Sequence, residues 1–205
     1  MNPNKTVAII LAAGEARRMG QAKQLMEYRG KTLIEMAIEK ILSLSIPGVV
    51  ILGAGSDRIR AKIDTHQINI SINECWTEGI SSSIRTGIRA AAELQPSLGG
   101  ILLVLADQPG VTKDHLLSLL KEGTAHRMMA ASKYGGILGV PAYFPSKYFD
   151  QLLQLTGDQG ARSLLNGSPE SVISITFEPA AVDIDTSKDW QDFIQDDPDV
   201  NNSIN

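Results

Sequence analysis

Short, continuous runs of apolar residues alternate along this chain with segments whose apolar residues recur at helical spacing. The runs at residues 7–12, 49–52 and 101–106 are the clearest, and the last contains no alternating polar positions. A strand that is apolar on both sides is typical of a parallel sheet covered by helices on both faces. Between these runs, residues 33–44 repeat their apolar positions as an amphipathic helix does. The alternation predicts an α/β fold with a mostly parallel, Rossmann-like sheet and helices on both of its faces.

The other expected elements continue this alternation, and a pair of strands joined by a glycine-rich turn follows residue 127. We expect further helices at residues 56–63, 81–94, 113–121, 146–155, 159–165 and 187–194, and further strands at 68–72, 128–133, 140–144 and 172–177. Thr112 is expected to cap the helix at 113–121. The strand pair after residue 127 predicts a small β flap. We predict one domain over residues 1–195, with parts at about 5–125 and about 126–195, and a flexible tail at 196–205.

The composition is that of an ordinary globular protein and argues against several kinds of site. Of the 205 residues, 43% are hydrophobic and 20% are charged, and a formal net charge of −4 gives no reason to expect a nucleic-acid surface. The one cysteine, Cys75, excludes an intrachain disulfide and is expected to be an inert core thiol. The histidines lie at no metal-ligand spacing, so a structural zinc site is not expected. Without a signal peptide or a membrane-length apolar run, we expect a cytoplasmic protein with no membrane partner.

A glycine-rich, basic loop follows the first expected strand, in the segment LAAGEARRMGQAK from Leu11 to Lys23. Glycine lets the backbone approach a ligand, exposed N–H groups can surround an anion, and Arg17, Arg18 and Lys23 can neutralise phosphate charge. The segment matches neither the P-loop nor the dinucleotide fingerprint, and the GAG at 53–55 lacks that fingerprint's third glycine. The residues alone leave two interpretations open: a phosphate-binding loop, or a strand-to-helix turn with solvated cations.

The same segment resembles the L-[AG]-[AG]-G-x-[SG]-x-R-M-G-x-x-K signature of the MobA-like nucleotidyltransferases. Within that superfamily the chain is most similar to the molybdenum cofactor cytidylyltransferases, from residue 7 to about residue 194. The resemblance implies a nucleotide-diphospho-sugar transferase-like fold, with residues 5–125 binding the nucleotide and 126–195 lying on the acceptor side. It implies that Arg18 and Lys23 bind phosphate and act in catalysis, and that the nucleotide lies along Leu11, Ala12, Ala13 and Gly14. Ala16 departs from the signature, which usually has serine there.

A run of serines stands after Gly79 at an expected helix start. Their hydroxyls and the free N–H groups of a helix start could hold a nucleotide, and simple helix capping explains them equally well. The resemblance favours the first interpretation, because the cytidylyltransferases carry a similar N-x-x-W-x-x-G-x-x-x-S-[IL]-R-x-G segment at their nucleotide site. It implies nucleotide-binding roles for Gly79, Ser81, Ser82 and Ser83. Trp76 could stack on a ligand or pack in the core, and Arg85 could bind phosphate or pair with a carboxylate.

Asp107 ends the most continuously apolar strand, at the edge where parallel sheets bind ligands. A carboxylate there suits Mg²⁺, which prefers one or two carboxylates with phosphate oxygens and water. A turn aspartate before the Pro-Gly pair at 109–110 explains it equally well. The resemblance implies that Asp107 is a catalytic metal ligand, and that Asp185 of the DIDT segment is the second, with Asp183 as its substitute. Thr186 could instead cap the last helix, which would leave Asp185 simply exposed.

Two glycine-containing segments, one ending in Gly-Val-Pro at residue 141 and the other reading TGDQGAR from residue 156, resemble the acceptor side of the cytidylyltransferases. The resemblance implies acceptor-binding roles for Gly139, Pro141, Gly157, Asp158 and Arg162. Arg162 could bind the acceptor phosphate, and a capped helix start at Asp158 is an equally good physical explanation of that segment. The implied ligands are CTP or another NTP and a molybdopterin-type acceptor, and a molybdenum enzyme could be a partner.

The resemblance predicts transfer of CMP from CTP to the phosphate of the molybdenum–pterin cofactor, with release of pyrophosphate. Positioning and charge neutralisation by Mg²⁺, Arg18 and Lys23 suffice for this reaction, because the acceptor phosphate is already an anion. Three competing functions stay open: the same chemistry with another nucleotide or acceptor, a non-catalytic maturation factor that carries the cofactor, and an NAD-dependent oxidoreductase. The incomplete glycine fingerprint disfavours the last.

Overall fold

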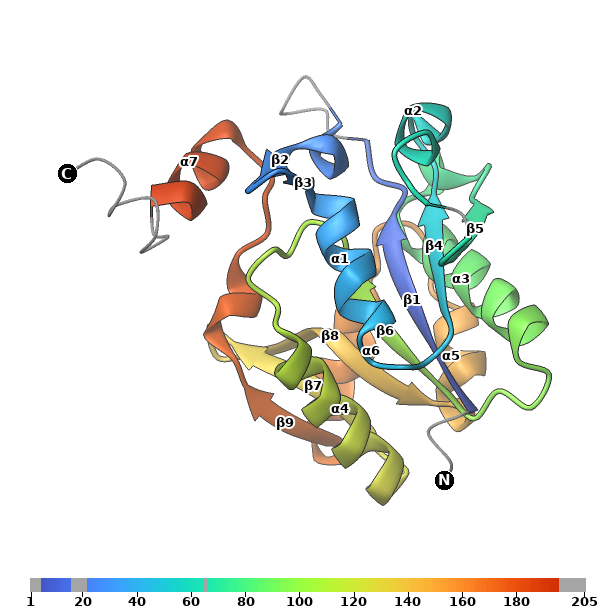
Figure 1. Ribbon diagram of the computed structural model, residues 1–205. Coiled ribbons are helices and arrows are strands. Elements are labelled where there is room, and N and C mark those ends of the chain that lie inside the picture. Colours follow the sequence, from blue (N-terminus) through green and yellow to red (C-terminus); the bar gives the residue numbers. More distant parts are fainter. Residues whose placement is uncertain (1–4, 16–21, 65, 196–205) are drawn as a thin grey trace.

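The computed structural model describes residues 5–15, 22–64 and 66–195. Its centre is a seven-stranded sheet in the order β5-β4-β1-β6-β8-β7-β9 (Figure 1). The strands are β1 (Thr6–Ala12), β4 (Gly48–Leu52), β5 (Asn69–Ile72), β6 (Gly100–Leu105), β7 (Met129–Tyr134), β8 (Ile137–Pro145) and β9 (Val172–Thr176). Neighbouring strands run parallel except where β8 pairs with β6 and with β7. The predicted mostly parallel sheet is therefore confirmed.

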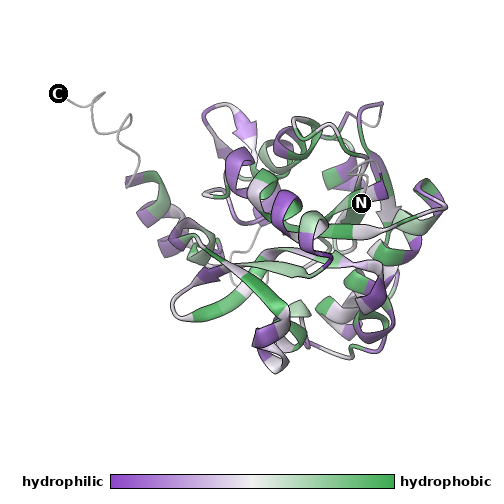
Figure 2. Cartoon of the chain, turned by 90° about the horizontal axis from the view of Figure 1, so that it is seen from below, coloured by the Kyte–Doolittle hydropathy of each residue, from purple (hydrophilic) through white to green (hydrophobic). Residues whose placement is uncertain are grey.

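Helices cover both faces of this sheet, as predicted. They are α1 (Leu33–Leu42), α2 (Ser56–Arg60), α3 (Ile80–Leu94), α4 (Lys113–His126), α5 (Phe149–Leu153), α6 (Ala161–Gly167) and α7 (Ser187–Gln195). The apolar residues of α1, α2 and α4 pack with Ala8 and Ile10 of β1, and those of α3, α5 and α6 pack with Val7 and Ile9. Successive residues of β1 thus face opposite apolar layers, which explains its unbroken apolar sequence. Figure 2 shows the strands largely hydrophobic between helices of mixed character. In the described parts of the chain, no helix is both long and apolar enough to cross a bilayer.

Several element boundaries differ from the expected ones. Helix α4 continues past residue 121 to His126, and Thr112 caps it as predicted, because its Oγ1 accepts from the N–H of His115 at 3.3 Å. The single helix expected at 146–155 is a 3-10 turn, Ser146–Tyr148, followed by α5. The two strands expected after residue 127 form the β7–β8 hairpin, which extends the main sheet beyond β6 and pairs with β9, so these strands belong to the main sheet and form no separate flap.

A second, two-stranded sheet formed by β2 (Glu27–Tyr28) and β3 (Lys31–Thr32) escapes sequence prediction, because strands of two residues show no alternation. The Tyr28 ring packs against Phe193 and Trp190 of α7, at centroid distances of 4.9 and 6.3 Å. The segment before α7 contributes a buried isoleucine to the same cluster. These contacts hold the C-terminal helix beside the small sheet, on the side of the molecule where β1 ends (Figure 1).

Candidate active site

A cavity of about 400 Å³ opens beyond the carboxyl ends of β1 and β6, which pair side by side. Sites of this size commonly bind small ligands, and this edge is where parallel sheets bind them. The cavity is lined by Leu11, Ala12, Ala13, Gly14, Glu15, Lys23, Gln24, Trp76, Thr77, Gly79, Ile80, Ser83, Leu105, Ala106, Asp107 and Asp158. It therefore joins the loop after β1, the start of α3 and the strand-end aspartate, as the sequence predicted.

Most of the predicted nucleotide-binding residues lie on this wall. They are Leu11, Ala12, Ala13, Gly14, Lys23, Gly79 and Ser83. Arg18 lies outside the described residues, and so does the departure from the signature at Ala16. The described part of the loop thus brings Lys23 to the cavity that the start of α3 also lines, whereas the position of Arg18 stays a prediction.

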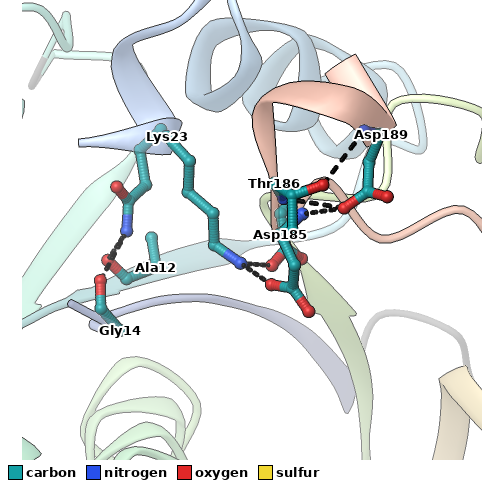
Figure 3. A network of polar contacts seen from close by, with 8 residues as sticks. Ala12, Gly14, Lys23, Asp185, Thr186 and Asp189 are labelled. Carbon is teal, nitrogen blue, oxygen red and sulfur yellow. Dashed lines mark hydrogen bonds and ion pairs between the residues drawn. The ribbon is translucent and has the colours of Figure 1, made fainter. Parts of the chain in front are cut away.

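The Lys23 side chain lies between the two predicted metal ligands. Its Nζ donates to Asp107 Oδ2 and, at 2.8 Å, to Asp185 Oδ1 (Figure 3). The Lys23 and Asp107 side chains are only 15% and 16% exposed, whereas that of Asp185 is 53% exposed. Burial lowers the pKa of Lys23, but the charge of Asp107 and hydrogen bonds to both carboxylates outweigh it, so the pKa is raised overall. Lys23 is therefore a cation that neutralises carboxylate charge at the strand end.

The backbone attaches the Asp185 segment to Asp107. The N–H of Ile184 donates to the Asp107 carbonyl at 3.1 Å, so the two aspartates that flank Ile184 come close to the strand end. Burial, with repulsion by Asp107, raises the pKa of Asp183 to about 6. Among the described residues, Oδ1 of Asp107 and Oδ1 of Asp183 are buried without a hydrogen-bond partner. A buried carboxylate oxygen without a donor is an unsatisfied acceptor that a cation would satisfy.

These residues fit a divalent cation that arrives with phosphate. In the described part of the chain, no three His, Cys, Asp or Glu side chains are grouped as a metal site. Asp107 and Asp185 nevertheless converge on one ammonium, and Asp107 keeps a buried oxygen free of any partner within the described residues. Two carboxylates are enough for Mg²⁺, because phosphate oxygens and water supply its other ligands.

Sequence comparison places this chain among known proteins. Residues 8–172 match the MobA-like NTP transferase domain. The chain belongs to the MobA-like NTP transferase family. It is accordingly a nucleotidyltransferase, and solved structures of related proteins share its fold.

Three relatives align along most of their length with this transferase. Purine catabolism protein PucB of Bacillus subtilis (strain 168) is 30% identical over 195 residues, 90% of this chain and 93% of that protein. Nicotine blue oxidoreductase of Paenarthrobacter nicotinovorans is 32% identical over 190 residues, 87% of this chain and 91% of that protein. Molybdenum cofactor cytidylyltransferase of Escherichia coli (strain K12) is 24% identical over 187 residues, 89% of this chain and 92% of that protein.

A solved structure confirms the fold over nearly the whole chain. Rv0371c of Mycobacterium tuberculosis H37Rv superposes with a TM-score of 0.81 at 25% identity, covering 95% of this chain and 100% of that chain. The same protein in complex with manganese superposes with a TM-score of 0.78 at 24% identity, covering 94% of this chain and 99% of that chain. A divalent ion therefore binds to a protein of this fold.

In this MobA-like transferase, Gln24 fixes the described ends of the loop after β1. Its Nε2 donates to the carbonyl oxygens of Ala12 and Gly14, both at 3.0 Å, and the residue is 3% exposed. These bonds satisfy carbonyl groups at the strand end and attach the backbone next to Lys23 to the cavity wall. Sequence reasoning missed Gln24, because a lone glutamine in a loop carries no signal of this role.

The three serines have different places in the transferase. Ser83 lies on the cavity wall, and its Oγ accepts from Asn73 Nδ2 at 2.9 Å. The same Nδ2 donates to Ser82 Oγ at 2.8 Å, so the buried Asn73 side chain ties the serines to the loop after β5. Ser81 and Ser82 are buried and do not line the cavity. The interpretation that these serines simply cap the helix is wrong, because the N-cap residue of α3 is Gly79 and no side chain caps this helix start.

The TGDQGAR segment meets the start of α3 at Gly79. Gly79 has a φ of +97°, and a Cβ there would lie 2.5 Å from both the Gly157 carbonyl oxygen and Asp158 Oδ1. The N–H of Ser81 donates to the same Gly157 carbonyl at 3.2 Å. Asp158, predicted on the acceptor side, therefore lines the same cavity as Gly14. The alternative interpretation, in which Asp158 caps the following helix, is wrong, because the N-cap residue of α6 is Gly160.

The structure does not bring the other predicted acceptor residues onto the cavity wall. Gly139 and Pro141 lie in β8, where a Cβ on Gly139 would collide with the Tyr134 hydroxyl at 2.1 Å. Arg162 donates to that hydroxyl at 3.2 Å, and the hydroxyl donates to the Val140 carbonyl at 3.2 Å. These residues form one patch, which Gln108, the residue after Asp107, contacts by donating to the Val140 carbonyl at 3.3 Å, and their role in acceptor binding stays a prediction.

Local contacts decide the roles of four further residues that the sequence left ambiguous. Thr186 caps α7, since its Oγ1 accepts from the N–H of Asp189 at 3.2 Å, while Asp185 still reaches Lys23 (Figure 3). Arg85 pairs with Glu78 at 2.7 Å, as the second of its two interpretations predicted. The expectation of a core thiol is wrong, because Cys75 is exposed. Trp76 lies half-buried on the cavity wall rather than in the core.

A buried histidine that is linked to Pro141 through Ser132 makes the stability of the transferase depend on pH. His115 Nε2 lies 2.7 Å from Ser132 Oγ, which donates to the Pro141 carbonyl at 2.7 Å, and its ring stacks on Phe177. Burial lowers the pKa of His115 from 6.5 to about 4. Between these values the unfolded chain binds the extra proton, so the free energy of unfolding falls as the pH falls.

We expect this loss to reach about 3 kcal/mol between pH 6.5 and pH 4, measured by urea unfolding. The pKa of Asp183 is raised to about 6, so that group has the opposite effect and gains stability as the pH falls. Comparison with His115→Gln isolates the histidine, because both proteins retain Asp183. An equal pH dependence in the two proteins would contradict the assignment.

Proposed function

We propose that this nucleotidyltransferase moves CMP from CTP to the phosphate of a molybdenum–pterin cofactor and releases pyrophosphate. The observation that carries the proposal is the shared cavity. The loop after β1 with Gly14, the ammonium of Lys23 and the strand-end carboxylate of Asp107 all line it. A triphosphate and its cation need an anion-binding loop facing a carboxylate, which is the arrangement that these residues provide.

Charge and position would drive the reaction. An acceptor phosphate oxygen attacks the α-phosphorus of CTP, the bond from that phosphorus to the bridging oxygen breaks, and the electron pair leaves with pyrophosphate. Lys23 would stabilise the charge that develops on pyrophosphate, and Arg18 would act with it. Asp107 and Asp185 would hold Mg²⁺, which supplies a positive charge at the reacting phosphate. Ser83 and Asp158 line the same cavity, where the nucleoside would lie.

The acceptor and base assignments rest on the relatives. One relative is named molybdenum cofactor cytidylyltransferase, and the LAAG form of the loop resembles the cytidylyl enzymes. The acceptor would approach from the neighbouring patch of Gly139, Pro141 and Arg162, and the product could pass to a molybdenum enzyme. Location in the cytoplasm, where this cofactor chemistry would meet CTP, is part of the same proposal.

The deciding experiment is release of pyrophosphate by the purified protein with CTP, GTP, ATP or UTP, with and without molybdenum-loaded pterin. We expect release only with the pterin, and fastest with CTP. Fastest release with GTP would show that the enzyme prefers guanine to cytosine. Release with a sugar phosphate but not with the pterin would show that the acceptor is a sugar phosphate. Tight pterin binding without any release would support a carrier instead of an enzyme of this reaction. Because one relative is named an oxidoreductase, NADH oxidation serves as a parallel negative control.

We further predict that Lys23→Ala raises the KM for the NTP by about tenfold or more, because it removes one charge-assisted hydrogen bond to phosphate. Initial rates of pyrophosphate release over a range of NTP concentrations provide the measurement. Lys31→Ala is the control, since Lys31 is exposed and pairs with Glu39 at 2.6 Å. An unchanged KM in Lys23→Ala would contradict the phosphate-binding role of this lysine.

A further inference from the structure

Two cations compete for the position between the Asp107 and Asp185 carboxylates: the Lys23 ammonium and the proposed metal ion. The Lys23 ammonium contacts Asp107 Oδ2 and, at 2.8 Å, Asp185 Oδ1. The proposed function assigns the same two carboxylates to a divalent metal. An ammonium and a metal ion cannot share this position, because like charges at contact distance repel strongly. Binding of the metal between Asp107 and Asp185 therefore requires that the ammonium leave that position.

The site is built so that Lys23 can leave by rotation of its side chain. The neighbouring Gln24 holds the backbone through its bonds to the Ala12 and Gly14 carbonyls, and this anchor does not involve the lysine side chain. Lys23 also lines the cavity together with Gly14, so its ammonium can turn from the carboxylates toward a triphosphate there. Asp185 is 53% exposed, so water can solvate that carboxylate when the ammonium departs.

We propose that Lys23 is an internal counter-ion that keeps the metal position closed until a triphosphate draws it away. This inference rests on the proposed function and deepens it: the ligand of the site is the metal–nucleotide complex, and the free divalent ion binds poorly. The phosphates attract the ammonium, and its departure leaves Asp107 and Asp185 without their cation. The ion carried by the nucleotide then replaces it, so nucleotide and metal each strengthen the binding of the other.

Direct titration with Mn²⁺ tests the inference without any turnover. The free ion is followed by its electron paramagnetic resonance signal, with the protein in the absence of nucleotide. We expect Lys23→Met to bind Mn²⁺ at least about tenfold more tightly than the wild type, because two carboxylates then lack a counter-ion. Adding CTP should tighten Mn²⁺ binding to the wild type and should do so much less in Lys23→Met.

Lys31→Met is the matched control, because it removes the same charge from a lysine that pairs with a carboxylate outside the cavity. It should bind Mn²⁺ as the wild type does. Equal Mn²⁺ affinity in Lys23→Met and the wild type would overturn the inference, and so would an equal gain in Lys31→Met. Lys23→Gln replaces Lys23→Met if circular dichroism shows that the latter is unfolded.

A second substitution separates this inference from the function on which it rests. Adding Asp107→Asn to Lys23→Met should abolish the gained Mn²⁺ affinity, and retention of that affinity would overturn the placement of the ion. Failure of the proposed function is read separately, as the absence of pyrophosphate release by the wild type with every NTP. If the wild type releases pyrophosphate but binds free Mn²⁺ as tightly as Lys23→Met does, the counter-ion role of Lys23 is wrong and the proposed function still holds.

Discussion

Asp107→Asn is expected to lower the rate of pyrophosphate release by about a thousandfold or more while the protein stays folded. The amide keeps the shape of the side chain but removes the negative charge that lies against Lys23 and would hold the metal. The Asp107 carbonyl keeps its bond from Ile184, because the substitution leaves the backbone intact. Initial rates at saturating CTP and pterin measure the effect, and circular dichroism checks the fold.

Neighbouring carboxylates provide the comparison for Asp107→Asn. Asp185→Asn should also reduce the rate strongly, since Asp185 shares the Lys23 ammonium with Asp107. Asp183→Asn should reduce it less, because the Lys23 ammonium contacts Asp107 and Asp185, the two carboxylates that would hold the metal. Activity near the wild-type value in Asp107→Asn would contradict the metal-binding role of Asp107. A greater loss in Asp183→Asn than in Asp185→Asn would indicate that Asp183, and not Asp185, is the second metal ligand.

Gly79→Ala is expected to lower the free energy of unfolding by about 3 kcal/mol and to weaken CTP binding. The residue has a φ of +97°, which an alanine adopts only with strain, and the added Cβ would lie 2.5 Å from the Gly157 carbonyl oxygen. Relief requires the Gly157–Asp158 turn to retreat from α3, and this displaces the Asp158 side of the cavity. Urea unfolding and calorimetric titration with CTP measure the two effects.

Gly55→Ala separates strain from collision in this test. Gly55 also has a positive φ, of +64°, but a Cβ there meets nothing within 4 Å. We expect it to cost about 1 kcal/mol and to leave CTP binding unchanged. If both variants lose the same stability and bind CTP equally, the contact between Gly79 and the Gly157–Asp158 turn has no role in shaping the cavity.

The parts of the site that sequence could predict are those fixed by strand ends. The unbroken apolar runs identify β1 and β6, and parallel strands place their following loops at one edge. Lys23 and Asp107 could therefore be expected together although 84 positions separate them. The resemblance to the MobA-like family supplied Asp185, which no periodic pattern would have brought to the same edge.

The parts that sequence could not predict depend on contacts between elements. Gln24 and Asn73 each bond to groups from different segments, and neither belongs to a pattern that implies such bonds. The β2–β3 sheet is too short to show alternation, and its packing on α7 involves rings that are distant in sequence. The bond from Arg162 to Tyr134 joins α6 to β7, a contact that no sequence pattern indicates, so the sequence shows Arg162 only as a cation available for phosphate.

The order in which the chain supplies its carboxylates has a consequence for biosynthesis. Every strand of the main sheet is complete by Thr176, yet the Asp185 carboxylate follows it and is held in place through α7 and the Tyr28 cluster. A polypeptide that terminates before residue 183 would contain the whole main sheet and the loop after β1. Of the two carboxylates that contact Lys23, it would contain Asp107 but lack Asp185. On the proposed mechanism, translation must therefore reach the last helix before the enzyme can be competent, and truncated products would lack its chemistry.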